Sequence, residues 1–351
     1  MEFRRSQLEF STDLPALSAG RSVLFYDQVL LQPARVGAPQ ARAFKLWASK
    51  FPVRYPLKAG ESLKEVRGLP ALVTRLLKDL SGLPGKPETF VAVGGGSVGD
   101  VVGFLASICK RGVPLIQIPS TWVAALDSAH GGKTAMNVGG FKNQIGTFYP
   151  AEKIYLVKSL LMSQPAKRAE EAYGELAKIA LIDGGDWADL FQKTSVQGGE
   201  LIWKYLRPAI EAKYKIVLKD PFETQGLRRC LNLGHTMGHV LEALQKVPHG
   251  RAVGKGLLFS LEWSRNRKVL SQQDFDHILP WLKQNYGIAP GISKKIPLQK
   301  LKRAVAEDKK VDSSGQVNFV FLKSAGNPQV EPVSVEEVVK EALRQGWSSS
   351  R

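Results

Sequence analysis

Three of the five histidines of this 351-residue chain lie close together, at His235, His239 and His249. The segment RCLNLGHTMGHVLEAL has apolar residues at helical spacing and no proline, which predicts one helix with His235 and His239 on the same face and Asn232 one turn before them. Glu175, in EEAYGELAKIAL, is predicted to lie on a second helix. Two imidazoles and a carboxylate around an open position are a usual ligand set for catalytic zinc. The cluster predicts a metal site, while acid–base chemistry and packing in a helical core remain open.

A second motif, AVGGGSVGDVVGFLAS at residues 92–107, suits a phosphate ligand. Its three glycines follow an apolar strand, so the backbone can turn tightly and approach a ligand closely. The helix that follows offers free backbone N–H groups and a positive dipole end. Asp27 ends an earlier strand, where a carboxylate can bind a ribose hydroxyl. The motif lacks the GK[ST] of a Walker loop and predicts a dinucleotide or another phosphate ligand, with a plain tight turn as the alternative.

A third stretch, residues 120–150, is rich in glycine and follows a predicted buried strand. It therefore lies at the carboxyl end of that strand, where open α/β sheets bind ligands. Asp127, Lys133, Lys142 and Asn143 provide a carboxylate, two ammonium groups and an amide, a set that suits an anionic sugar-like substrate. Long segments without regular structure are uncommon in compact domains, so we expect this one to serve function. A flexible loop with solvated lysines is the alternative.

The elements that would position these residues change character near residue 150. Before it, short apolar strands ending at Asp27, Gly96 and Thr121 alternate with helical stretches, a pattern typical of a parallel α/β layer. After it, segments such as GELIWKYLRPAIEAKYKIVLK place apolar residues at i, i+3, i+4 and i+7. We predict an α/β domain over residues 1–150 and a mostly helical domain over residues 151–351.

The composition limits the class of protein. The chain has 49 Lys and Arg against 32 Asp and Glu, a net charge of +17, but the basic residues are dispersed and not interleaved with aromatic residues, so we expect no nucleic-acid partner. No run of about eighteen apolar residues is present, and the first residues lack the apolar core of a signal peptide, which predicts a cytoplasmic protein with no membrane partner. Cys109 and Cys230 have no CxxC spacing, which fits a reducing compartment.

Six phrases of the sequence resemble, in the same order and with similar spacing, the motifs of the 3-dehydroquinate synthases of the sugar phosphate cyclase superfamily. They are VAVGGGSVGDVVGFLAS, KRGVPLIQIPSTWVAALDSAHGGKTAMNVGGFKNQIGTFYP, GELAKIAL, GLRRCLNLGHTMGHVLEAL, HGRAV and EDKK, and they run from about Asp27 to Lys310. The resemblance implies an N-terminal Rossmann-like domain that binds NAD, a C-terminal helical domain that binds one divalent metal, zinc or cobalt, and an active site in the cleft between them. Arg251 of HGRAV stands where the family usually has an acid, so the chain resembles a divergent member.

The resemblance also implies roles for individual residues. The implied metal ligands are Glu175, His235 and His249, so that His239 faces the substrate. The implied substrate contacts are Asp127, Lys133, Asn143, Lys178, Lys213, Arg228, Asn232, His239 and Lys309 or Lys310, with Arg111 reaching the substrate phosphate from the partner subunit of a homodimer. The implied NAD-binding residues are Asp27, Glu61, Lys64, Gly95, Gly96, Asp100, Ser120, Thr121 and Lys142. The loop KDPFETQGLRR is one residue longer than the usual form, which makes Lys215 an alternative to Lys213.

The implied reaction converts an anionic sugar phosphate, 3-deoxy-D-arabino-heptulosonate 7-phosphate, to 3-dehydroquinate and phosphate, a carbon–oxygen lyase step of the shikimate pathway to aromatic amino acids. NAD would oxidise an alcohol transiently, with the metal polarising its oxygen; phosphate would leave, and re-reduction and an intramolecular aldol step would follow. An amino-dehydroquinate synthase shares most of the motifs. A metal-dependent alcohol dehydrogenase of related fold and a basic binding protein with a degenerate site also remain open.

Overall fold

The computed structural model describes residues 3–18, 20–82, 87–286, 291–292, 294–307 and 315–349, without the side chains of residues 284–286. Lys309 and Lys310, two of the predicted substrate contacts, lie outside the described residues. The chain divides into two compact units, Met1–Arg168 and Ala169–Arg351. Each unit has its own hydrophobic core.

The first unit is built on a parallel sheet. In the described part of the chain this sheet has six strands in the order β1-β8-β5-β4-β2-β3, and every neighbouring pair is parallel. The strands are β1 (Gln7–Ser11), β2 (Ser22–Asp27), β3 (Val53–Leu57), β4 (Thr89–Gly94), β5 (Leu115–Pro119) and β8 (Lys153–Val157). The strands predicted from sequence correspond to β2, β4 and β5, so the predicted parallel α/β layer is confirmed.

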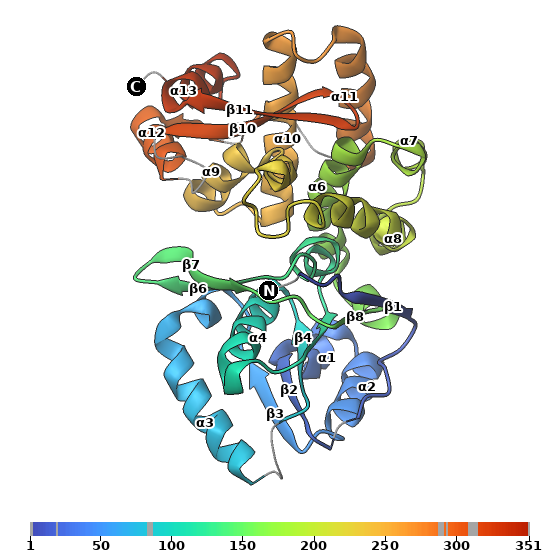
Figure 1. Cartoon of the computed structure of the whole chain (residues 1–351). Helices are drawn as coiled ribbons and strands as arrows, with labels where there is room; N and C mark the ends of the chain where they lie inside the picture. Colours follow the sequence, from blue (N-terminus) through green and yellow to red (C-terminus); the bar gives the residue numbers. More distant parts are fainter. Residues whose placement is uncertain are drawn as a thin grey trace. The chain divides into compact units, whose positions relative to one another are not determined.

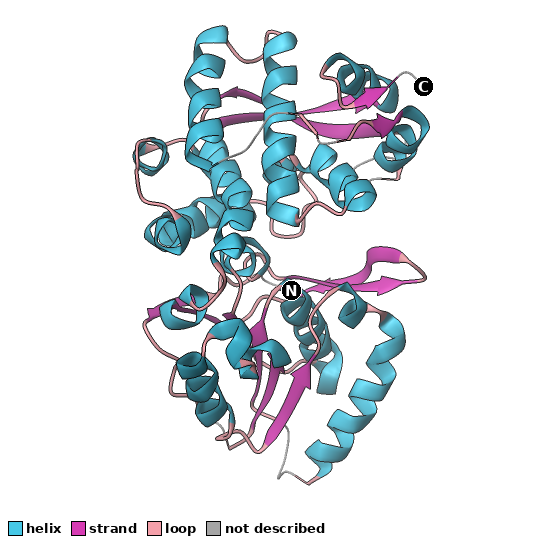
Figure 2. Cartoon of the chain, turned by 180° about the vertical axis from the view of Figure 1, so that it is seen from behind, coloured by secondary structure: helices cyan, strands magenta, loops and turns pink. Residues whose placement is uncertain are grey.

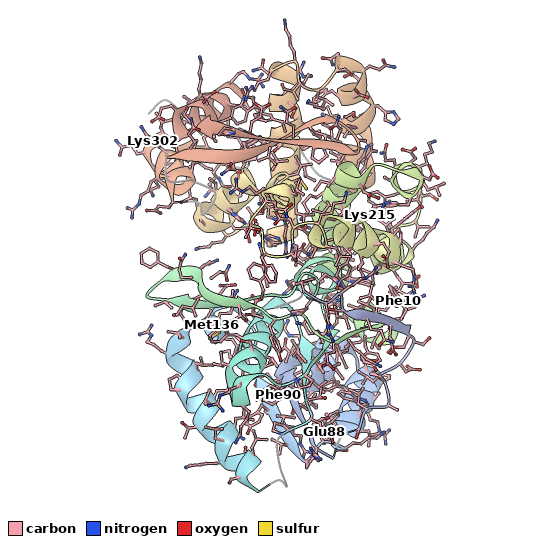
Figure 3. All side chains as sticks on the ribbon, in the orientation of Figure 1. Phe10, Glu88, Phe90, Met136, Lys215 and Lys302 are labelled. Carbon is pink, nitrogen blue, oxygen red and sulfur yellow. The ribbon has the colours of Figure 1, made fainter. Side chains whose placement is uncertain are left out.

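Helices cover both faces of this sheet (Figure 2). Leu24 and Tyr26 of β2 share a core cluster with Phe44 and Trp47 of α2 (Ala38–Ala48). The neighbouring residues of β2 point to the opposite face, which α4 (Gly96–Ile108) covers. Phe90, labelled in Figure 3, is fully buried on β4. Burial on both faces explains why these strands are continuous apolar runs.

Short helices complete the framework of the first unit. They are η1 (Gln28–Leu31), α1 (Pro33–Val36), η2 (Glu61–Lys64), η3 (Val66–Gly68), α3 (Leu69–Ser81), η4 (Cys109–Arg111) and α5 (Lys158–Met162). Both β8 and α5 follow residue 150, where the sequence pattern turns helical, yet they belong to this unit. The reason is that β8 pairs with both β1 and β5 and is therefore part of the sheet.

Most of residues 124–148 have regular structure, so the expectation of a long irregular segment is wrong. A π-helical turn, η5 (Ala124–Ser128), precedes a hairpin in which β6 (Lys133–Val138) pairs antiparallel with β7 (Phe141–Phe148) (Figure 1). Gly139 and Gly140 turn the chain with positive φ angles of 58° and 88°. The hairpin is hard to predict because β7 is largely exposed and shows little alternation of apolar and polar residues.

The second unit is mostly helical, as predicted, and also contains a hairpin. Its helices are α6 (Ala166–Asp183), α7 (Asp186–Gln192), α8 (Gly198–Val217), η6 (Leu227–Asn232), α9 (His235–Gln245), α10 (His249–Asn266), α11 (Gln272–Tyr286), α12 (Leu298–Ala306) and α13 (Val335–Arg344). The antiparallel pair β10 (Gln316–Ser324) and β11 (Asn327–Ser334) packs on α10, and two-residue strands β9 (Ile296–Pro297) and β12 (Ser348–Ser349) pair in parallel.

Aromatic side chains fill the core between α10 and β10. Phe259 and Trp263 of α10 contact Phe319, whose ring centroid lies 4.5 Å from that of Trp263. Trp347, near the end of the chain, packs on Phe259. This cluster fixes α10, whose first residue is His249. Among the described residues, no helix is long and apolar enough to cross a membrane.

Candidate metal centre and nucleotide site

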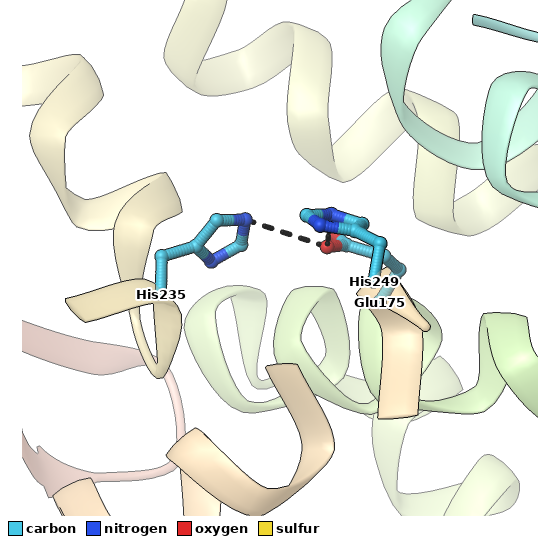
Figure 4. A group of neighbouring side chains, drawn as sticks. All are labelled: Glu175, His235 and His249. Carbon is cyan, nitrogen blue, oxygen red and sulfur yellow. Dashed lines mark hydrogen bonds and ion pairs between the residues drawn. The ribbon is translucent and has the colours of Figure 1, made fainter. Parts of the chain in front are cut away.

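Glu175, His235 and His249 come together in the second unit from three different helices (Figure 4). Oε1 of Glu175 lies 3.0 Å from Nε2 of His249 and 3.4 Å from Nε2 of His235. One possible ligand atom from each of the three residues lies within 4.8 Å of the other two. Glu175 is fully buried and His235 is 7% exposed. The three predicted ligands therefore lie close enough together to bind one ion.

Both histidines stand at the first residue of a helix. Gly234, with a φ of 78°, precedes His235 at the start of α9, and Pro248 precedes His249 at the start of α10. The prediction of one continuous helix over RCLNLGHTMGHVLEAL is wrong, because Gly234 adopts a left-handed conformation that interrupts it. Asn232 ends the separate helix η6 and is not one turn before His235 on the same helix.

The helices that carry the ligands cross in direct backbone contact. A Cβ atom on Gly174 would lie 2.0 Å from the carbonyl oxygen of Gly250, and one on Gly250 would lie 1.4 Å from that of Glu171. Similarly, a Cβ atom on Gly256 would lie 1.8 Å from the carbonyl oxygen of Gly234. Only glycine fits at these positions. The crossings bring α6 and α9 against α10, so main-chain atoms set the spacing of the three ligands.

Further groups orient the two imidazoles. Nδ1 of His249 lies 3.1 Å from Oε2 of Glu242, and Nδ1 of His235 lies 3.3 Å from the carbonyl oxygen of Leu233. Burial by itself lowers the pKa of His249, but the hydrogen bonds to Glu175 and Glu242 outweigh it and raise that pKa to about 10. Metal-binding histidines commonly direct their second nitrogen to a carboxylate or a carbonyl in this way.

These donors fit a divalent metal with nitrogen and oxygen ligands. Two Nε2 atoms and one carboxylate oxygen supply three ligands, which leaves a fourth tetrahedral position for water or substrate. Each imidazole has a partner at Nδ1, which leaves Nε2 to face the other ligands. Within the described residues, this is the one group of three or more His, Cys, Asp or Glu side chains with such geometry.

Lys178 lies beside the cluster. Its Nζ is 2.5 Å from Oε2 of Glu175, and the side chains of the two residues are 1% and 0% exposed. A buried carboxylate requires a compensating charge or hydrogen bonds. The ammonium group of Lys178 supplies a compensating charge for Glu175. The predicted substrate contact Lys178 is therefore positioned by a predicted metal ligand one helical turn before it.

Other predicted substrate contacts of this unit differ in exposure. Lys213 on α8 and Arg228 on η6 are both 4% exposed. Asn232 is half-buried, and His239 is exposed on α9, with its ring centroid 5.5 Å from that of His235. His239 therefore lies beside the cluster without belonging to it. Lys215, the alternative to Lys213, pairs with Asp183 at 2.9 Å, a contact on the surface of the unit.

A fully buried carboxylate organises the loop before Arg228. Asp220 accepts hydrogen bonds from the backbone N–H groups of Gln225, at 3.1 Å, and Arg228, at 3.2 Å. The guanidinium of Arg228 donates in turn to the carbonyl oxygen of Pro221, at 2.8 Å. Burial alone would raise the pKa of Asp220, but the backbone donors outweigh it, so the pKa is lowered. Asp220 thus determines where Arg228 stands.

Most of the predicted nucleotide-binding residues lie in the first unit near the carboxyl ends of the sheet strands, whereas Lys142 lies on β7. Asp27 ends β2 and Gly94 ends β4, and these strands are neighbours. From β2 the chain continues to β3 on one side, and from β4 it continues to β5 on the other. Such a topological switch point is where open α/β sheets bind ligands. Two further pairs follow the adjacent strands: Glu61 and Lys64 after β3, and Ser120 and Thr121 after β5.

The start of α4 provides room and donors for a phosphate. Gly95 is the N-cap residue, and no side chain caps the helix, so its first N–H groups can donate to an anion. A Cβ atom on Gly95 would lie 3.1 Å from Cγ2 of Thr121, and one on Gly96 would lie 3.1 Å from Oγ of Ser128. Glycine therefore lets the segment after β5 approach the helix closely, which fits a dinucleotide fold.

The carboxylate of Asp27 accepts a hydrogen bond from the backbone of its own chain. Its Oδ1 accepts a hydrogen bond from the N–H of Val29 at 3.1 Å and caps η1. Burial raises the pKa of Asp27, while hydrogen bonds from the backbone of Val29 and Ala59 work in the opposite direction. The carboxylate is thereby held at the switch point, where the sequence predicts a ribose contact.

Lys64 contacts one predicted NAD-binding residue, Asp100, and one predicted substrate contact, Asn143. Its Nζ lies 2.6 Å from Oδ2 of Asp100 and also donates to Oδ1 of Asn143. Burial raises the pKa of Asp100, and the positive charge of Lys64 partly offsets this effect. Asn137, which the sequence did not single out, donates to Oε2 of Glu61 at 3.0 Å and accepts from the N–H of Asn143 at 2.8 Å. Hydrogen bonds and an ion pair therefore connect four predicted residues, two of them through Asn137: Glu61, Lys64, Asp100 and Asn143.

The remaining predicted residues of this unit lie on the hairpin and on two turns. Lys133 and Lys142 are exposed on the hairpin, and Asp127 is half-buried in η5. Arg111 is exposed in η4 with a φ of 63°. His130, buried just after η5, has its Nε2 2.8 Å from the carbonyl oxygen of Ala125 and so secures the turn that carries Asp127.

Comparisons with known proteins agree with these features. A family model described as 3-dehydroquinate synthase N-terminal matches residues 54–171, and one described as 3-dehydroquinate synthase C-terminal matches residues 172–311. The chain is 33% identical over 294 residues to the 3-dehydroquinate synthase of Zymomonas mobilis subsp. mobilis, an alignment that covers 80% of this chain and 76% of that protein.

Two solved structures have a similar fold. A 2-deoxy-scyllo-inosose synthase complexed with carbaglucose-6-phosphate, NAD⁺ and Co²⁺ superposes with a TM-score of 0.79 at 21% identity, covering 97% of this chain and 96% of that one. The 2-epi-5-epi-valiolone synthase of Streptomyces hygroscopicus subsp. jinggangensis 5008, with NAD⁺ and Zn²⁺ bound, gives a TM-score of 0.78 at 21% identity and covers 98% of both chains. At this identity the likeness establishes the fold.

Proposed function

Because the chain belongs to the 3-dehydroquinate synthase family, we propose that it converts 3-deoxy-D-arabino-heptulosonate 7-phosphate to 3-dehydroquinate and phosphate. The observation that carries this proposal is the cluster of buried Glu175 and His235 with half-buried His249, whose Nδ1 lies beside Glu242. An alcohol must lose its proton before a hydride can leave its carbon, and a three-ligand divalent metal centre promotes that step.

The proposed cofactors are NAD and one divalent metal, zinc or cobalt, which are the groups bound in the two similar structures. When bound, NAD accepts and later returns a hydride, while the metal polarises a substrate oxygen. Most of the predicted NAD-binding residues lie at the switch point of the first unit, and the predicted metal ligands lie in the second. Each unit thus supplies the groups for one of the two cofactors.

The residues of the second unit have distinct proposed tasks. With a metal bound, Glu242 would keep the remaining proton of His249 on Nδ1, so that the lone pair of Nε2 can bind the ion. His239 is exposed beside His235 and can accept or donate a proton at the substrate. Lys213 and Arg228 supply positive charge for the carboxylate and phosphate of the substrate. Their near-complete burial strengthens such contacts, because water screens them weakly.

The proposal extends to assembly and location. We infer a homodimer in which Arg111 reaches the substrate phosphate of the partner subunit, supported by the resemblance of the motif that contains it and by its exposure in η4. The dispersed basic residues are expected to draw towards the protein a substrate that carries both a carboxylate and a phosphate. A biosynthetic enzyme of this class is expected to work in the cytoplasm.

The direct test uses metal-loaded protein with NAD and the heptulosonate phosphate. Inorganic phosphate and the absorbance of NADH are followed in the same reaction. We expect stoichiometric phosphate with no net NADH, because the hydride returns to the substrate. Net NADH production would instead indicate a dehydrogenase, and release of phosphate only from an amino analogue of the substrate would indicate an amino-dehydroquinate synthase.

A further inference from the structure

We propose that Asn137 is a positioning residue whose one buried amide sets the placement of Glu61 and Asn143 together. This inference rests on the proposed function, which gives Glu61 a role in binding NAD and Asn143 a role in binding the sugar phosphate. Asn137 itself lies on β6 and is 3% exposed, so it is not offered as a contact for either ligand. It acts through the two residues that it holds.

Both ends of the Asn137 amide are used. Nδ2 donates to Oε2 of Glu61 at 3.0 Å, and Oδ1 accepts from the backbone N–H of Asn143 at 2.8 Å. A parallel bridge between the backbones of Asn137 and Glu65 holds β6 next to η2. The two hydrogen bonds define which way the amide is turned, since neither end can exchange donor for acceptor.

Asn143 needs such support because its backbone is in an uncommon conformation. Its φ of 51° is left-handed, and it lies where the register of the β6–β7 hairpin shifts between Met136 and Val138. Asparagine adopts this conformation more readily than most residues, but an exposed strand does not by itself maintain it. Asn137 fixes the main chain of Asn143, and Lys64 fixes its side-chain oxygen.

Stability alone does not account for a buried amide at this position. Met136, the adjacent residue of β6, packs against Val101 and Phe104 as an ordinary core residue. Glu61 and Asn143 are exposed, so water could satisfy both groups if Asn137 were apolar. An internal hydrogen bond adds little stability over a bond to water. What the amide adds is a fixed geometry between the segment after β3 and the strand β7.

The first test compares Asn137→Asp, Asn137→Ala and the double variant Asn137→Asp with Glu61→Gln. In Asn137→Asp a second carboxylate faces Glu61, and we expect the KM for NAD to rise about tenfold, as for loss of a charged hydrogen bond, with kcat changed less. In the double variant the amide introduced at position 61 can donate to the carboxylate introduced at position 137, so the KM should fall below that of Asn137→Asp alone. The single variant Glu61→Gln is measured beside them, because Glu61 also has a proposed role in NAD binding. A KM for NAD within about twofold of wild type in both Asn137 variants, or a double variant whose KM equals the product of the two single effects, would overturn the proposal.

A second measurement does not depend on activity. Hydrogen–deuterium exchange of the cofactor-free protein reports on the N–H of Asn143, which loses its acceptor in Asn137→Ala and keeps one in Asn137→Asp. We expect faster exchange in the peptide over residues 141–146 in the alanine variant, with the peptides of β2 and β4 unchanged. Unchanged exchange over β7 would refute the positioning role. Absence of phosphate release by the wild type would refute the proposed function and leave this result standing.

Discussion

Nδ1 of His249 lies 3.1 Å from Oε2 of Glu242, while Nε2 of the same ring lies 3.0 Å from Oε1 of Glu175. The imidazole is therefore held between two carboxylates, one from α9 and one from α6. Glu242 is separated from His235 by two turns of α9, so a single helix provides one predicted ligand and orients another.

Removing the carboxylate of Glu242 should weaken metal binding. In Glu242→Ala we expect the metal dissociation constant to rise by about 10–100-fold, the usual effect of losing a group that orients a histidine ligand. Glu242→Gln is the matched control, because its amide oxygen can still accept from Nδ1, and its metal affinity should lie nearer to the wild type. Competition with a chromogenic chelator measures both. Equal affinity in the alanine variant and the wild type would contradict the role of Glu242.

The three clustered histidines should not be equivalent. His235→Ala and His249→Ala each remove a predicted ligand, so both should purify with little bound metal. His239→Ala should retain metal, since its ring lies outside the ligand group, and should lose most of its turnover. Metal content by mass spectrometry, measured beside phosphate release, separates the two effects. Comparable metal loss in all three variants would show that the division of roles is wrong.

The crossing of α6 and α10 should be sensitive to a single methyl group. In Gly174→Ala the new Cβ would lie 2.0 Å from the carbonyl oxygen of Gly250 and 2.7 Å from the nitrogen of Gly254, so the helices must separate. We expect a loss of about 1–3 kcal/mol in the free energy of unfolding, together with lower metal affinity. Gly68→Ala is the control, because a Cβ atom on Gly68 would have no atom within 4 Å beyond its chain neighbours. Urea unfolding of the metal-free proteins and chelator competition give the two quantities.

The loop that Asp220 organises should be sensitive to pH. Its pKa in the folded protein lies below the ordinary value of 3.8, so its stabilising contribution is complete above pH 3.8 and is lost as the pH falls through the lowered folded pKa. Asp220→Asn should therefore be less stable than the wild type at neutral pH, and the difference should narrow below pH 3.8. Thermal unfolding of the metal-free wild type and variant, from neutral pH to below pH 3.8, tests this prediction. A difference in stability that stays constant into acid would exclude a contribution from the ionised carboxylate.

Much of this architecture could be predicted from the sequence because it depends on local patterns. The buried strands β2, β4 and β5 are continuous apolar runs that end in Asp, Gly or Pro, and parallel strands leave that signature. The cluster of His235 and His249 is visible as an unusual concentration of a rare residue. Glu175 lies some sixty residues before His235, so its residue type makes it a candidate third ligand, and the family resemblance assigns it that role.

The rest depends on contacts that no local pattern encodes. Asn137 and Asp220 are polar residues in ordinary surroundings of the sequence, and only the folded chain shows that each is buried with backbone donors around it. The spacing of apolar residues predicts one continuous helix across Gly234. The helix is interrupted there because Gly234 has a φ of 78°, and a pattern of apolar residues does not reveal a backbone angle. Glu242 could have been suspected, as it lies seven residues after His235 on the same predicted helix face.

The glycine contacts between α6 and α10 also indicate which positions of these helices tolerate substitution. Arg251, at a position where the family resemblance implies an acid, pairs with Glu170 at 2.8 Å through side chains that are 46% and 51% exposed. This reversal of charge lies on the outside of the same two helices whose main chains touch at Gly174 and Gly250. Because these main-chain contacts set the distance between Glu175 and His249, we expect substitutions on the outer faces of the two helices to leave that distance unchanged, and side chains at the paired glycines to increase it.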